Sequence, residues 1–93
     1  MLKVNEYFDG KVKSIAFQTA TLPATVGVME VGQYQFDTAK KETVTVVSGC
    51  LTVKLPGSDQ WKAVPASQKF EVAADKVFQL QVDEETAYLC TYE

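Results

Sequence analysis

The chain of 93 residues contains no histidine and no arginine. Without an imidazole, it lacks the commonest protein ligand of transition metals and the commonest general acid–base group at neutral pH. Without a guanidinium, it lacks the planar group that binds phosphate through two parallel hydrogen bonds. We therefore expect no metal and no other cofactor, and any anion must be bound by lysine, hydroxyl or backbone amide groups.

Long apolar runs are also missing. No segment approaches the length that spans a membrane, and Met1 to Phe8 lacks the apolar core of a secretion signal. Cysteine is scarce, with Cys50 and Cys90 widely separated in the chain. A paired or catalytic cysteine is the alternative to two structural thiols, but no histidine is present to generate a thiolate. We expect reduced thiols in a cytoplasmic protein without a membrane partner.

Positive charge is limited to nine lysines against twelve acidic residues, so the formal net charge is −3. Binding of nucleic acid through its phosphates requires a basic face, and we expect no such partner. A chain this short buries only about 60–65% of its unfolded surface, which makes further burial between subunits favourable. The length predicts one domain, residues 1–93, and a homodimer.

What the sequence does contain is alternation of apolar and polar residues over short segments, which is typical of strands with one buried face. The central stretch is Gly32 to Gly49, where Tyr34 and Phe36 alternate on a first arm and Val44 and Val46 on a second. This pattern predicts a hairpin. Similar segments are Lys11–Phe17, Thr25–Val31, Cys50–Leu55, Trp61–Pro65, Lys69–Val72, Val77–Val82 and Thr86–Tyr92. Eight or nine short strands with little or no helix indicate an all-β barrel or jelly roll.

Residue spacing in the central stretch resembles the first cupin motif. Gly32-x5-Thr38 and Glu42-x6-Gly49 follow that motif, but Thr38 and Lys40 stand where cupins usually have metal-binding histidines. Phe78 falls where the second cupin motif would place another histidine. The sequence therefore resembles a cupin that has no metal site.

Matching segments cover essentially the whole chain, and the chain resembles a member of the pyrimidine/purine nucleoside phosphorylase family of small cupins. The matching segments are Asn5-Glu6-Tyr7-Phe8, Gly10-Lys11-Val12-Lys13-Ser14-Ile15, Val26-Gly27-Val28-Met29, Gly32-x-Tyr34-x-Phe36-x-Thr38, Val46-x-Ser48-Gly49, Leu55-Pro56, Trp61, Phe70-x-Val72, Leu80-Gln81-Val82 and Tyr88-Leu89-Cys90-x-Tyr92. One departure is Ala73-Ala74-Asp75, where the family usually has a Pro-Gly turn. The resemblance implies phosphorolysis of purine and pyrimidine nucleosides, with inorganic phosphate as co-substrate and no cofactor.

Such a reaction needs a group that binds phosphate. Lys13, Ser14, Thr38 and Lys40 are the candidates, because ammonium groups supply charge and hydroxyls supply directed donors. Solvent-exposed lysines on strand edges are common, so each lysine also has a purely structural explanation. Ser14 shares strand parity with Val12 and Ala16, which predicts a buried hydroxyl that needs a partner.

Glu42 is the candidate catalytic residue. It shares parity with Val44 and Val46, so it should face the interior. An ionised carboxylate there can accept hydrogen bonds from two ribose hydroxyls and stabilise positive charge that develops at C1′. The structural alternative is an exposed glutamate that pairs with Lys40 or Lys41.

The nucleoside should also contact aromatic rings, because stacking tolerates any base and would suit broad specificity. The candidate substrate-binding residues are Tyr34, Phe36, Thr38, Phe78 and Tyr88, where Thr38 adds a hydroxyl. Each ring could equally be part of the hydrophobic core. Two other classes of function remain open at this point: a non-catalytic cupin that binds a small metabolite, and a structural module that only dimerises.

Overall fold

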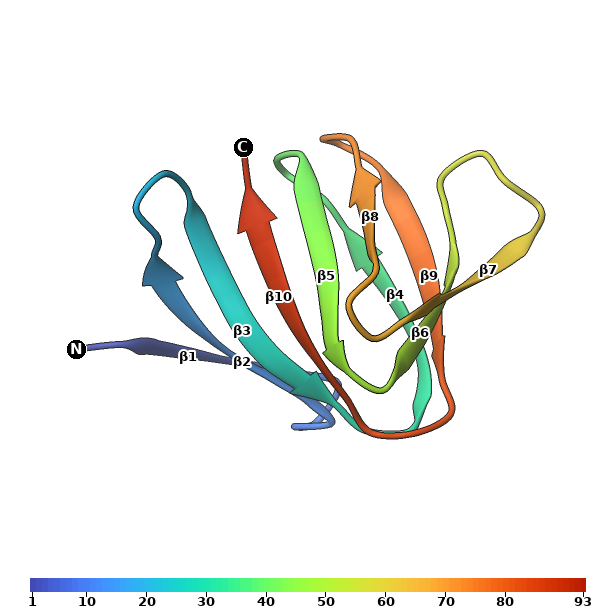
Figure 1. The fold of residues 1–93 in the computed structure, drawn as a ribbon, viewed down its shortest axis with the longest axis horizontal. Helices are drawn as coiled ribbons and strands as arrows, with labels where there is room; N and C mark the ends of the chain where they lie inside the picture. The colour runs from blue at the N-terminus through green and yellow to red at the C-terminus, as the bar shows by residue number, and fades with distance from the viewer.

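The computed structural model describes all residues from Met1 to Glu93 and contains ten strands and no helix (Figure 1). It therefore has no helix long and apolar enough to cross a membrane. The strands are β1 (Lys3–Tyr7), β2 (Val12–Gln18), β3 (Pro23–Met29), β4 (Gly32–Asp37), β5 (Glu42–Ser48), β6 (Cys50–Lys54), β7 (Trp61–Pro65), β8 (Lys69–Val72), β9 (Val77–Val82) and β10 (Thr86–Tyr92).

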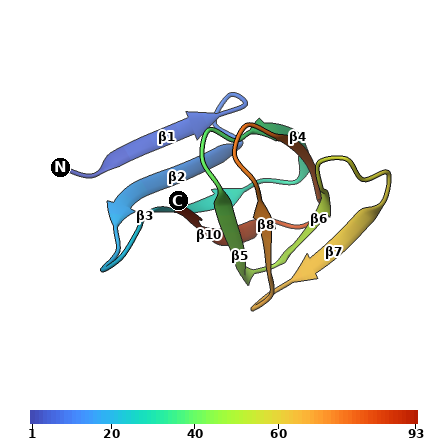
Figure 2. The same cartoon turned by 90° about the horizontal axis from the view of Figure 1, so that it is seen from above.

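Two antiparallel sheets form the fold. One has six strands in the order β1-β2-β3-β10-β5-β8, and the other has four in the order β4-β9-β6-β7. Figures 1 and 2 show that the strands curve around a common interior, while β1 lies at one end with the N-terminus projecting away. The all-β prediction is confirmed. The tenth strand is β1, which alternation did not predict because the residues of Lys3–Tyr7 do not alternate in polarity.

The interior is a single cluster of fifteen buried apolar residues contributed by both sheets. Alternation along the strands decides which side chains enter it. On β2, Val12 and Ser14 are buried while Lys13 is exposed, and on β9 the buried residues are Phe78, Leu80 and Val82, as predicted. Burial of apolar surface on this scale is the main stabilising contribution to a small domain.

The predicted hairpin between Gly32 and Gly49 is wrong. β4 pairs with β9 in the four-stranded sheet, whereas β5 pairs with β10 and β8 in the six-stranded sheet. The loop after β4 therefore crosses from one sheet to the other. Alternation identified both strands, but it carries no information about which strand each of them pairs with.

Thr38 fixes this crossing. Its buried hydroxyl donates a hydrogen bond to the Ala73 carbonyl at 2.7 Å and accepts one from the Lys76 amide at 2.9 Å. The Thr38 backbone also bonds to Lys76 and Asp75, at 2.8 and 2.9 Å. The loop after β4 is thus tied to the loop between β8 and β9, and Thr38 has a structural role.

We expect Thr38→Val to destabilise the fold by about 1–3 kcal/mol, because it leaves the Ala73 carbonyl and the Lys76 amide without their partner. That loss corresponds to a melting midpoint lower by roughly 4–8 °C per kcal/mol. Thr52→Val is the matched control, because Thr52 is half-buried on β6 and its hydroxyl makes no hydrogen bond within the protein. Equal midpoints for the two variants would contradict the assigned role.

Candidate active site

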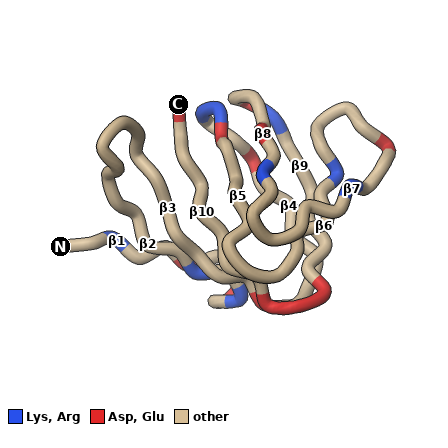
Figure 3. Tube along the Cα trace, viewed as in Figure 1, with Lys and Arg blue, Asp and Glu red and all other residues tan.

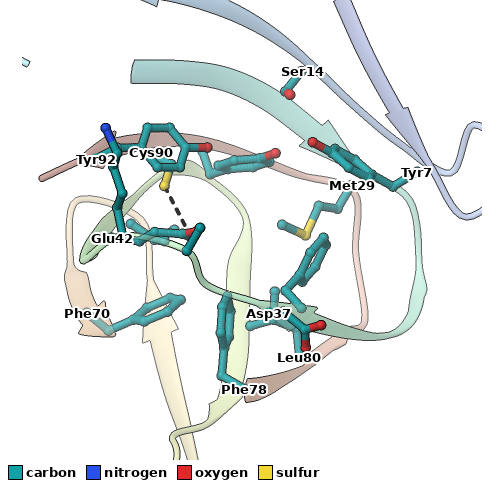
Figure 4. Close-up of a pocket in the computed structure, with 15 residues that line it drawn as sticks. Tyr7, Ser14, Met29, Asp37, Glu42, Phe70, Phe78, Leu80, Cys90 and Tyr92 are labelled. Atoms are coloured by element: carbon teal, nitrogen blue, oxygen red, sulfur yellow. Dashed lines mark hydrogen bonds between the residues drawn. The ribbon is translucent and has the colours of Figure 1, made fainter. Parts of the chain in front are cut away.

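A cavity of about 350 Å³ lies inside the fold (Figure 4). Cavities that bind small molecules usually fall between about 300 and 1,000 Å³, so this one has room for a single small ligand. Both sheets contribute to its walls. The lining residues are Tyr7, Ser14, Met29, Phe36, Asp37, Ala39, Lys40, Glu42, Val44, Phe70, Phe78, Leu80, Tyr88, Cys90 and Tyr92.

Polar groups and aromatic rings both line the wall, and Phe70 of β8 belongs to the same sheet as Glu42. β2, β5 and β10 of the six-stranded sheet provide Ser14, Glu42 and three residues of β10 that share one face: Tyr88, Cys90 and Tyr92. The four-stranded sheet provides Phe36 and Phe78, which are directly opposite each other on β4 and β9. Their ring centroids are 5.8 Å apart with an interplanar angle of 27°. A flat ligand in the cavity can therefore contact these two rings and also reach the polar atoms of β2, β5 and β10.

Two carboxylates line the cavity, Asp37 and Glu42, and only Glu42 is half-buried. It begins β5, half-buried, directly opposite Tyr92 on β10. The Cys90 thiol donates a hydrogen bond to Glu42 Oε1 at 3.5 Å (Figure 4). No lysine lies within ion-pair distance of it, because the ion pairs of this protein involve other carboxylates. Burial raises the pKa of Glu42, and the Cys90 hydrogen bond offsets part of that rise.

Tyr88 and Ser14 are brought together by a glycine. Gly27 on β3 is directly opposite Tyr88 on β10 and Ser14 on β2. Since Gly27 has no side chain, the Tyr88 ring lies across β3, and a Cβ at Gly27 would be only 2.6 Å from its hydroxyl oxygen. Burial raises the pKa of Tyr88 to about 12, and a hydrogen bond with Ser14 offsets part of the rise. Both groups are neutral hydroxyls at the cavity wall.

The two neighbours of the Glu42 carboxylate on β10, Cys90 and Tyr92, are neutral groups. Burial, followed by the charge of Glu42, raises the pKa of Cys90 to about 12, so the thiol is protonated and is not a nucleophile at neutral pH. Burial also raises the pKa of Tyr92, whose hydroxyl is 3.0 Å from the Thr25 hydroxyl. The Cys90 thiol thus orients Glu42 without neutralising its charge.

Four exposed lining residues, Tyr7, Asp37, Ala39 and Lys40, mark where the cavity meets solvent. Lys40 lies in the loop between β4 and β5. Figure 3 shows basic residues in this loop and places the acidic turn between β9 and β10 at the opposite end of the molecule. That turn carries Asp83, Glu84 and Glu85. The opening itself carries charge of both signs, because Asp37 lies there with Lys40.

Six of the predicted site residues lie together in the cavity. These are Ser14, Phe36, Lys40, Glu42, Phe78 and Tyr88. They come from five strands and one loop, and strand parity accounts for the inward direction of all except Lys40. The expectation that Ser14 is buried is confirmed, at 3% exposure.

Three predicted site residues do not line the cavity. Lys13 lies on the outer face of β2, where it forms an ion pair with Glu6 at 3.4 Å, because its parity is opposite to that of Ser14. Tyr34 is buried and its hydroxyl donates to the Glu30 carbonyl at 2.7 Å. Thr38 is occupied by its bonds to Ala73 and Lys76.

Sequence reasoning missed several lining residues. Cys90 and Tyr92 share parity with Tyr88, so extending the alternation along the last strand would have identified them. Tyr7 had no comparable signal, since its segment, Lys3–Tyr7, does not alternate in polarity. Figure 4 shows Tyr7 and Ser14 on the side of the cavity away from Phe70.

The donor groups of the cavity do not fit a cupin metal. No group of three histidine, cysteine, aspartate or glutamate side chains comes together anywhere in the structure. The positions that correspond to cupin histidines hold Thr38, Lys40 and Phe78, and only Glu42 remains as a hard ligand. A divalent metal prefers imidazole or several carboxylates.

The two curved sheets and the enclosed cavity define a small cupin. The fold is similar to that of an RmlC-like cupin from Shewanella frigidimarina, with a TM-score of 0.76 over 98% of this chain and 82% of that chain at 18% identity. The chain belongs to the pyrimidine/purine nucleoside phosphorylase family, whose model matches residues 2–92. The family prediction is confirmed.

Individual relatives match over their whole length. A pyrimidine/purine nucleoside phosphorylase of Magnetococcus marinus is 66% identical over 92 residues, which are 99% of each chain. A protein of unknown function from Vibrio parahaemolyticus has a crystal structure that matches with a TM-score of 0.96 and 42% identity, over 100% of this chain and 99% of that chain. Residues and fold thus agree along the entire chain.

Proposed function

We propose that this protein is a nucleoside phosphorylase and that the cavity around Glu42 is its active site. In this reaction a phosphate oxygen forms a bond to the sugar C1′ while the bond from C1′ to the base nitrogen breaks. The bonding electrons leave with the base, which takes up a proton from solvent. The products are a free base and a pentose 1-phosphate.

The observation that carries the proposal is the position of Glu42, a carboxylate on the cavity wall without a lysine partner. Positive charge develops at the sugar carbon as the base departs, and a fixed carboxylate nearby stabilises it most when water is excluded. The same carboxylate can accept hydrogen bonds from two ribose hydroxyls. Its ionised form is held in place by the Cys90 thiol.

The remaining groups suit the other parts of the substrates. Phe36 and Phe78 offer ring faces that accept a purine or a pyrimidine without reading its edge, which suits broad specificity. Lys40 at the opening offers the positive charge for phosphate, and the Ser14 and Tyr88 hydroxyls offer hydrogen bonds inside. Tyr34 and Lys13 lie outside the cavity, so we assign them no contact with substrate.

The direct test is incubation of the purified protein with inosine or uridine, with and without inorganic phosphate, followed by chromatography of the free base. We expect base release from both nucleosides only when phosphate is present. A non-catalytic metabolite-binding cupin would release no base, and a hydrolase would not require phosphate. Membership of the phosphorylase family favours the catalytic outcome over the binding alternative.

Lys40→Gln is expected to raise the KM for phosphate by roughly 10–100-fold, because a hydrogen bond to a charged group contributes about 1.5–3 kcal/mol. The KM for the nucleoside should change little, since Lys40 lies at the opening. Lys62→Gln is the matched control, because Lys62 is an exposed lysine on β7 outside the cavity. An unchanged phosphate KM in Lys40→Gln would remove Lys40 from the phosphate site.

The proposal assigns no metal or other cofactor to the site, since the donor set described above does not suit one. It also places the protein in the cytoplasm, which the two free thiols of Cys50 and Cys90 support because they are compatible with a reducing compartment. Retention of full activity after dialysis against a chelator is the expected result. Loss of activity that a divalent metal restores would contradict the metal-free mechanism.

The proposed enzyme is a homodimer formed through the outer face of the six-stranded sheet. Val4, Ile15, Val26 and Leu89 lie opposite one another in a row across β1, β2, β3 and β10. Val4, Ile15 and Val26 are 59%, 43% and 46% exposed. A strand such as β3 that is apolar on both faces is typical of a sheet covered on both sides.

A second copy of the chain is the proposed partner of this face. The Glu6–Lys13 ion pair lies beside the apolar row, so a two-fold axis can set Glu6 of each copy near Lys13 of the other. Val26→Lys is expected to shift the sedimenting species to monomer. Val77→Lys, at an equally exposed valine of β9, should not. A monomeric wild-type protein at micromolar concentration would contradict the dimer.

A further inference from the structure

The cavity is unusually rich in aromatic rings for its size. Six of its fifteen lining residues carry one, and they come from both sheets and from the end of β1. The rings belong to Tyr7, Phe36, Phe70, Phe78, Tyr88 and Tyr92. The face of such a ring carries negative electrostatic potential and attracts a cation.

Glu42 is placed among these rings. Tyr92 is directly opposite it on β10, and Phe70 is a diagonal neighbour on β8, since Glu42 pairs with Val72 and Val44 pairs with Phe70. Phe70 in turn contacts Phe78, with ring centroids 6.0 Å apart. Figure 4 shows Glu42, Phe70 and Phe78 on the same side of the cavity.

The one positive side chain that lines the cavity, Lys40, is exposed at the opening and forms no ion pair with Glu42. Glu42 has no lysine within ion-pair distance, and the thiol and phenols around it are neutral. Lys41, its neighbour in the chain, is directed away and pairs with Glu71 and Glu93 at 3.4 Å each. A half-buried carboxylate in a cavity lined by aromatic rings lacks a positive partner that would compensate for its lost hydration.

We propose that the interior of the cavity selects a cation, and that a ribose-like ring with a protonated amine binds there more tightly than the neutral sugar. The inference rests on the proposed function, because it places the sugar ring beside Glu42. It goes further by naming the charge of the preferred ligand and the side chains that select it. Phosphate, in contrast, would bind at the opening near Lys40.

The test is calorimetric binding of two ligands that differ only in charge: a protonated pyrrolidine analogue of ribose and its neutral tetrahydrofuran counterpart. Titrations are run with and without inorganic phosphate. We expect the cation to bind at least about tenfold more tightly, since aromatic rings and a carboxylate both attract positive charge. Equal affinities, or no binding of either ligand, would overturn the proposal.

Two variants identify the selecting group. Glu42→Gln keeps the shape of the side chain and should abolish the preference for the cation. Asp37→Asn is the matched control, because Asp37 is also a lining carboxylate but is exposed to solvent, and it should retain the preference. A preference that survives in Glu42→Gln, or that falls equally in both variants, would overturn the role of Glu42.

These measurements separate the inference from the enzymatic function. Phosphate-dependent release of base without any preference for the cation would leave the phosphorylase assignment intact and refute the inference. Preference for the cation without release of base would support the inference as a property of the binding site and refute the assignment.

Discussion

Replacing Glu42 by glutamine is expected to lower kcat/KM for phosphorolysis by about 10²–10³-fold, the usual cost of removing one fixed group that stabilises transition-state charge. The neutral amide keeps the shape of the side chain but cannot balance positive charge at C1′. In the wild type, kcat/KM should rise as the pH increases through the pKa of Glu42, which burial raises above its ordinary value.

Stability measurements show whether the loss of activity in Glu42→Gln comes from the missing carboxylate charge or from a less stable fold. Because the folded pKa of Glu42 is raised, its proton stabilises the fold at low pH, and this contribution is lost as the pH rises through the folded pKa. At neutral pH, therefore, Glu42→Gln should unfold at the same temperature as the wild type or at a higher one. Inactivity with a lower midpoint would instead indicate a structural role.

The control for charge is Glu71→Gln. Glu71 is exposed on β8 and pairs with Lys41 outside the cavity, so its replacement removes one negative charge without altering the site. We expect nearly unchanged kinetics, since exposed ion pairs contribute little. A Glu42→Gln enzyme as active as Glu71→Gln would show that the proposed carboxylate is not catalytic.

Gly27→Ala is expected to have the largest effect on the fold. The new Cβ would meet the Tyr88 hydroxyl at 2.6 Å and the Lys13 carbonyl oxygen at 2.7 Å. The second contact is backbone, so rotating a side chain cannot relieve both, and β2 must move away from β3. Overpacking of this kind costs about 1–3 kcal/mol or somewhat more. At roughly 4–8 °C per kcal/mol, the melting midpoint should fall by about 10 °C or more.

Gly32→Ala provides the comparison. Gly32 begins β4, and a Cβ there would meet only the outer atoms of the Tyr34 ring, starting at 3.0 Å. That ring end can shift by a few tenths of an ångström, so a much smaller change in midpoint is expected. Gly27→Ala should also impair activity, because displacing Tyr88 alters the cavity wall. Similar midpoints for the two variants would contradict the close approach at Gly27.

Local alternation was sufficient to predict most of the strands and the buried face of each. It placed Ser14, Glu42 and Phe78 on the buried faces of their strands, and all three line the cavity. The prediction succeeded because successive side chains of a strand point to opposite faces of the sheet. In a strand with one buried face, every second residue is therefore buried. The same rule separates Ser14 from Lys13, so their adjacency in sequence does not make them a common phosphate site.

Alternation failed where partners are distant in sequence. The hairpin predicted between Gly32 and Gly49 does not form, because β4 and β5 belong to different sheets. Thr38 could not be recognised as a structural residue before Ala73 and Lys76 were known to lie beside it. β1 lacks the alternating pattern, and its strand conformation depends on pairing with β2.

The sequence by itself determined the class of fold, the family, and the lack of imidazole and guanidinium chemistry, because composition and strand parity are local properties of the chain. Only the tertiary structure decided that Glu42 has no positive partner, that Cys90 and Tyr92 border it, and that Tyr88 crosses Gly27 to reach Ser14. These relations depend on strand pairing between residues far apart in the chain, which fixes how two curved sheets enclose a cavity.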